Sequence, residues 1–133
     1  MKRILVAYDG GLPARRALST AIELAKVMDG HLTVVSVVPI HPGRAPMDPW
    51  DDPAVHAQEL LDAKAILAEQ HVDAELVEPF GDPARTIERI AQEGDYDLVV
   101  VGSRGLGPVS RFLQGSVSEH LATHAQTPVL IAR

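Results

Sequence analysis

The 133-residue sequence contains no cysteine, which excludes disulfides, thiolate metal sites and cysteine nucleophiles. Aromatic residues make up only 4% of the chain, so a hydrophobic core must be built mainly from aliphatic side chains. No apolar run is long enough to span a bilayer, and the run that follows Lys2 and Arg3 is too short for a secretory signal peptide. These absences predict a cytoplasmic protein that has no membrane partner.

An excess of positive charge and the common nucleotide-enzyme motifs are absent as well. The formal net charge is −6, which argues against nucleic acid as the main partner because such binding depends on clustered Lys and Arg. The chain has no GxxxxGK[ST] phosphate loop and no HxGH or SGGxDS motif. No nucleophile stands beside a paired base, so we expect slow catalysis at most.

The sequence does contain a regular alternation of aliphatic strands and amphipathic helices. Its hydrophobic fraction of 46% is enough for the core of one domain, residues 1–133. The expected strands are residues 2–7, 31–38, 72–78, 97–101 and 128–132, and the expected helices are residues 12–28, 55–70, 83–93 and 116–124. This order predicts an α/β fold with a doubly wound, five-stranded parallel sheet of order 3-2-1-4-5.

Helical spacing also predicts which side chains of these helices face the core. The inward candidates are Leu18, Ile22, Ala25 and either Val27 or Met28 in the first helix, Leu60, Leu61, Ala65 and Leu67 in the second, and Ile87 and Ile90 in the third.

A glycine-rich segment, residues 97–118, leads from the fourth strand to the last helix. At Gly102, Gly105 and Gly115 the missing side chains would let backbone N–H groups meet the oxygens of a phosphate. The same glycines could be ordinary turn residues. Ser116 followed by Glu119 is also a capping box, which would only begin the helix.

A second polar signal, Asp9-Gly10-Gly11, follows the first strand. In the predicted sheet the carboxyl ends of the first and fourth strands meet at the switch point, where ligands bind in such folds. Asp9 could accept a hydrogen bond from an adenine amino group or a ribose hydroxyl, help to hold a cation, or begin an Asx turn or cap the next helix. The meeting of the two signals favours a phosphorylated ligand at this edge.

The spacing Gly102-x2-Gly105-x9-Gly115-Ser116 resembles the nucleotide signature of the universal stress protein family, in its ATP-binding branch. The resemblance covers the whole chain and includes Asp9-Gly10 and the segments GDPARTI, VVVGSRG, GSVSEHL and PVLIAR. It implies a Rossmann-like three-layer sandwich, similar to the adenine nucleotide alpha hydrolases, and a role in stress response.

By this resemblance Asp9 and the backbone near Val37 meet adenine, while the two glycine turns hold the ribose and phosphates of ATP. Mg²⁺ would accompany the phosphates. Gly11 stands where the family usually has serine, which removes one hydroxyl contact or helix cap. The implied nucleotide-binding residues are Asp9, Val37, Gly102, Ser103, Arg104, Gly105, Gly115, Ser116, Val117 and Ser118.

The function expected from the resemblance is that of an ATP-binding regulatory protein, homodimeric through the edge strand Val129 to Ala132. The nucleotide would order the glycine loop and switch the binding of an unidentified regulatory partner, with slow hydrolysis or none. Three alternatives stay open: a weak ATPase or phosphotransferase, a sensor of AMP or a cyclic nucleotide, and a dimeric scaffold that binds no nucleotide.

Three smaller expectations complete the reading of the sequence. The proline-rich segment from Pro39 to Pro53 could be a plain connection, a lid or a docking loop for a partner. His120 and His124 share a helix face, and we expect surface histidines there rather than metal ligands. A β-branched residue at Gly102 or Gly115 is expected to abolish nucleotide binding without unfolding the protein.

Overall fold

Strands and helices alternate along the chain in the predicted order. The computed structural model describes residues 2–38, 53–102 and 115–132, except for the side chains of residues 53–56 and 115–119. The elements are β1 (Arg3–Ala7), α1 (Leu12–Met28), β2 (His31–Val35), α2 (Pro53–Glu69), β3 (Ala74–Val77), α3 (Pro83–Glu93), β4 (Leu98–Gly102), α4 (Gly115–His124) and β5 (Val129–Ala132). Most of residues 39–53, including the expected lid or docking loop, lies outside this description.

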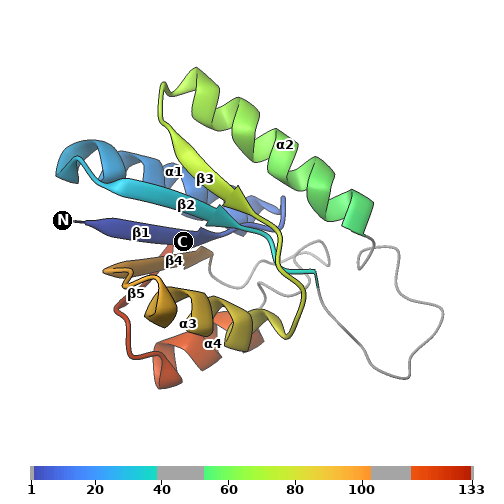
Figure 1. Cartoon of the computed structure of the whole chain (residues 1–133), viewed down its shortest axis with the longest axis vertical. Coiled ribbons are helices and arrows are strands. Elements are labelled where there is room, and N and C mark those ends of the chain that lie inside the picture. The colour runs from blue at the N-terminus through green and yellow to red at the C-terminus, as the bar shows by residue number, and fades with distance from the viewer. Residues whose placement is uncertain (1, 39–52, 103–114, 133) are drawn as a thin grey trace.

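The five strands form one sheet in the order β3-β2-β1-β4-β5, and all neighbouring strands are parallel. Helices α1 and α2 cover one face, and α3 and α4 cover the other (Figure 1). Because both faces are covered, β1, β2 and β4 are buried along nearly their whole length. The predicted doubly wound, three-layer fold is therefore confirmed.

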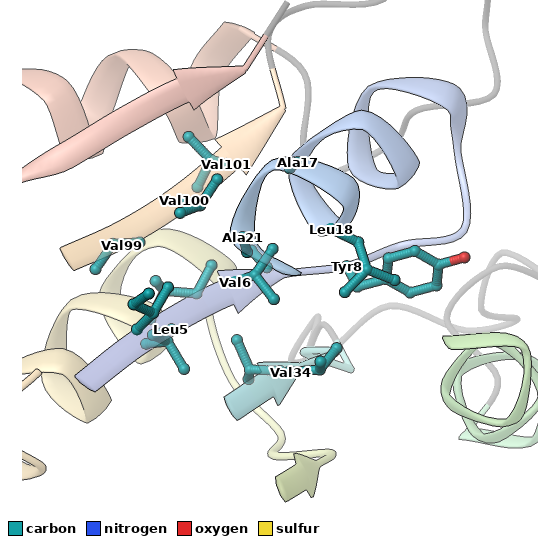
Figure 2. Close-up of a cluster of buried hydrophobic side chains, with 14 of the residues drawn as sticks. Leu5, Val6, Tyr8, Ala17, Leu18, Ala21, Val34, Val99, Val100 and Val101 are labelled. Atoms are coloured by element: carbon teal, nitrogen blue, oxygen red, sulfur yellow. The ribbon is translucent and has the colours of Figure 1, made fainter. Parts of the chain in front are cut away.

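The core is aliphatic, as the scarcity of aromatic residues predicted. Side chains of β1, β2 and β4 pack together with small residues of α1 (Figure 2). Two tyrosines, Tyr8 and Tyr96, join this core. The hydroxyl of Tyr96 donates to Oγ1 of Thr33 over 2.7 Å, so its polar end is satisfied inside the protein.

The second strand is shorter than predicted, and its pairing explains why. The last hydrogen bond from the β1 side runs from the Tyr8 N–H to the carbonyl of Val35. Beyond that point Ser36 and Val38 donate to carbonyls on the β3 side, at Val77 and Pro79. The chain thus leaves β1 after Val35, although its aliphatic sequence continues to Val38.

The predicted inward faces are confirmed in part. Leu61 is 58% exposed and Ala65 is also exposed, so both predictions are wrong for α2. Met28 rather than Val27 packs against the core at the end of α1. The other inward candidates of the three helices are buried or partly buried against the core.

None of the helices in the described ranges combines the length and the apolar character needed to cross a membrane.

Candidate functional site

The carboxyl end of β4 packs against the first turn of α1, the helix that follows β1. A Cβ atom added to Gly102 would lie 2.5 Å from the carbonyl oxygen of Pro13. The end of β4 therefore touches the start of α1, which directly follows the Asp9-Gly10-Gly11 turn. The structure brings together the two segments that carry the predicted ligand contacts.

This contact overturns the expected outcome of substituting Gly102. A β-branched side chain there would collide with the backbone of Pro13, with distances of 2.5 Å to its carbonyl carbon and oxygen. Gly102 therefore serves the close approach of β4 and α1, and replacing it would disturb the fold. The structure therefore predicts a destabilised variant at this position, where the sequence analysis expected an undisturbed fold.

Asp9 is buried, with 5% of its surface exposed, and forms the turn that leads into α1. Its Oδ1 accepts a hydrogen bond from the Gly11 N–H over 2.9 Å, which is an Asx turn. Gly10 has a φ of +82°, a left-handed conformation that favours glycine. No side chain caps α1 at its N-cap Gly11, in agreement with the loss of a capping serine there.

The main chain of Val37 faces away from β3. Its neighbours Ser36 and Val38 both donate toward β3, so the Val37 N–H and C=O point to the β1 side, beyond the last β1 pairing. Neither group makes a main-chain hydrogen bond to any residue that the structure describes. An adjacent donor and acceptor of this kind match the edge of a nucleobase.

The remaining predicted contacts are placed only in part. Ser103, Arg104 and Gly105 lie outside the described residues. Gly115 begins α4, and Ser116, Val117 and Ser118 fall in the first turn of that helix. A helix N-terminus carries partial positive charge and unpaired N–H groups, so this position is compatible with phosphate binding and with simple capping.

Two polar residues that the sequence analysis missed lie beside the Asp9 turn. Glu59 on α2 is 9% exposed, and its Oε2 accepts a hydrogen bond from Oγ of Ser36 over 3.4 Å. The Cγ atom of Glu59 lies 3.2 Å from the position of a Cβ atom on Gly10. Neither residue has a sequence signal, since a lone glutamate in a helix is usually exposed.

Tyr8 also brings a polar group to this region. Its ring is fully buried beyond the end of β1 (Figure 2), and its hydroxyl interacts electrostatically with Arg15 on α1 and with Asp62 and Glu59 on α2. Burial raises the pKa of the Tyr8 hydroxyl, and the positive charge of Arg15 on α1 partly offsets this effect. The hydroxyl is therefore neutral at physiological pH.

The histidine pair on α4 lies apart from this edge and resembles an ordinary surface cluster. The rings of His120 and His124 stack with centroids 4.6 Å apart, and Nε2 of His120 lies 3.7 Å from a carboxylate oxygen of Glu88. Across the described part of the chain, no three acidic or histidine side chains come close enough to hold a metal ion.

Known proteins resemble this chain over its full length. The sequence model described as the universal stress protein family matches residues 1–133. A Staphylococcus aureus (strain USA300) protein, whose name assigns it to the universal stress proteins, is 36% identical over 151 residues, covering 99% of this chain and 84% of its own.

Solved structures agree with the sequence comparison. A universal stress protein family structure from Burkholderia pseudomallei is 33% identical, covers 98% of this chain and 94% of its own, and superposes with a TM-score of 0.72. The Archaeoglobus fulgidus universal stress protein in complex with dAMP shares the fold at 24% identity, with coverages of 100% and 98% and a TM-score of 0.77. The chain belongs to the universal stress protein family.

Proposed function

We propose that this protein binds an adenine nucleotide, in the first instance ATP, at the carboxyl edge of its sheet. The observation that carries the proposal is that Asp9, the main chain of Val37 and the end of β4 at Gly102 all reach this one edge. Ligands of doubly wound sheets bind at such a switch point.

Each part of the edge has a physical role in this proposal. The N–H and C=O of Val37 pair with the adenine edge, and Asp9 accepts a hydrogen bond from the base or the ribose. The glycine-containing residues 102–105 and the N-terminus of α4, with Ser116 and Ser118, hold the phosphates. Mg²⁺ is held through the phosphate oxygens.

The nucleotide acts as a regulatory ligand in this proposal, with slow hydrolysis or none. Occupancy would favour one conformation of the glycine-containing residues 102–105 and so control an unidentified partner protein in a cytoplasmic stress response. The sequence has no phosphate loop and none of the catalytic motifs considered above, which supports a regulatory role.

Calorimetric titration with ATP and Mg²⁺ tests the proposal. The wild-type protein should bind ATP, and Gly115→Val should abolish binding because its side chain would occupy the phosphate path at the start of α4. Ala122→Val is the matched control, since it adds bulk at an exposed position of the same helix. Absence of ATP binding, together with no nucleotide released from the acid-denatured purified protein, would favour a scaffold role instead.

A monophosphate ligand is the second candidate. The Archaeoglobus fulgidus protein of the same fold was solved in complex with dAMP. Titrations with AMP and cyclic AMP, each with and without Mg²⁺, separate the candidates. Tighter binding of a monophosphate than of ATP, with no effect of Mg²⁺, would assign the site to a mononucleotide.

A further inference from the structure

Glu59 is a buried acidic residue of α2. It lies on the same helix as Ala63 and Leu67, which pack into the core, and is 9% exposed. Burying a carboxylate costs free energy unless hydrogen bonds compensate for the lost water. An acidic side chain at this place therefore calls for a role beyond filling space.

The contacts of Glu59 connect two segments that are distant in sequence. Its Oε2 accepts a hydrogen bond from Ser36, in the segment that follows β2. Its aliphatic stem packs over Gly10, in the turn that follows β1, where a Cβ atom would come within 3.2 Å of Cγ. One side chain of α2 thus touches both segments at the carboxyl edge of the sheet.

Each of these segments carries one of the groups assigned above to the adenine base. Gly10 directly follows Asp9, whose carboxylate accepts the Gly11 N–H. Ser36 directly precedes Val37, whose main chain faces the β1 side. No β-ladder hydrogen bond links the two segments beyond the pair Tyr8 and Val35, within the part of the chain that the structure describes. Glu59 spans this break in the ladder.

We propose that Glu59 is a positioning residue, which holds the turn after β1 and the segment after β2 at the spacing that Asp9 and Val37 need to read an adenine base. This proposal rests on the proposed nucleotide-binding function. It predicts that Glu59 controls the selection of the base without contributing to the binding of phosphate.

Calorimetry with three probes, ATP, GTP and inorganic triphosphate, tests this selectivity. Glu59→Ala should weaken ATP binding about tenfold, the equivalent of one modest hydrogen bond, and leave triphosphate binding unchanged. The preference for ATP over GTP should fall accordingly. Glu59→Gln retains an oxygen that can accept from Ser36 and should stay within about threefold of wild type. Gln58→Ala, at an exposed neighbour on α2, is the control.

Two binding outcomes would overturn the proposal. Unchanged ATP affinity in Glu59→Ala would mean that the side chain does not position the site. Equal losses for ATP and triphosphate would indicate general damage to the protein, which thermal unfolding would also reveal.

Amide hydrogen exchange of the nucleotide-free protein separates this proposal from the proposed function. The Gly11 N–H is bonded to Asp9, so its exchange should be about tenfold faster in Glu59→Ala and unchanged in Gln58→Ala. Unchanged exchange would refute positioning by Glu59 whatever the ligand. Faster exchange in a protein that binds no nucleotide would instead refute the nucleotide function and leave the positioning intact.

Discussion

Tyr8 is the residue whose burial has the clearest consequence for pH dependence. Its hydroxyl oxygen is buried and has no hydrogen-bond partner among the described residues. Burial raises the pKa of this group above its usual value of 10.0. As pH rises, the unfolded chain loses the Tyr8 proton first, so the free energy of unfolding falls between the unfolded pKa and the higher folded pKa.

We therefore predict that Tyr8→Phe changes the free energy of unfolding by less than about 1 kcal/mol at neutral pH, because no good hydrogen bond is lost. Above a pH of about 10 the variant should lose stability more slowly than wild type. Urea unfolding of both proteins at neutral and alkaline pH measures the difference. Parallel curves across the alkaline range would show that the hydroxyl is already solvated in the folded state.

At the scale of elements, the contact between β4 and α1 depends on one glycine. Even the single methyl group of Gly102→Ala would meet Pro13 at 2.5 Å. We expect this substitution to lower the free energy of unfolding by about 1–3 kcal/mol, as overpacking of a core usually does. Urea unfolding measures the loss, with Ala122→Val as the control for added volume at an exposed position. A stability equal to that of wild type would mean that α1 can shift away from β4 at no cost.

The order and type of the elements could be predicted because they follow from the period of apolar residues. The ends of the strands could not be predicted from the sequence, because they depend on where neighbouring strands separate, as β1 and β2 do after Val35. For helices, the buried face could not always be predicted, as the exposed Leu61 shows. The apolar residues of α2 lie on most faces of the helix, so their spacing alone does not show which face is buried.

Some residues of the candidate site could be predicted from the sequence and others could not. Asp9 and Gly102 have local signals in the sequence, because Asp9 follows an aliphatic strand and precedes two glycines, and Gly102 is the glycine at the end of another aliphatic strand. Glu59 has none, since its burial results from the packing of α2 against Gly10 and Ser36. Contacts made through tertiary packing cannot be read from a local pattern.

At the scale of the whole molecule, β5 forms an open edge of the sheet. Among the described strands it pairs only with β4. The Val99 N–H donates to the carbonyl of Pro128, and Leu130 lies opposite Val100, so the main-chain groups of Val129 and Ile131 face outward. An aliphatic edge whose outward main-chain groups have no strand partner among the described residues favours pairing with a second chain.

We predict that the protein is a homodimer through this edge and that Ile131→Lys makes it monomeric, because a charge would be buried between the two β5 strands. Ile131 is 37% exposed in the single chain. Leu61→Lys places the same charge on an exposed leucine of α2 and should leave the dimer intact. Analytical ultracentrifugation distinguishes these states. A monomeric wild type would contradict the prediction, and a dimeric Ile131→Lys would place the interface elsewhere. Ala132 lies opposite Gly102 in the β4–β5 register, so the dimer edge is adjacent to the strand that ends at the proposed nucleotide site. The ATP affinity of the monomeric variant would therefore also show whether the nucleotide site and the dimer interface are coupled.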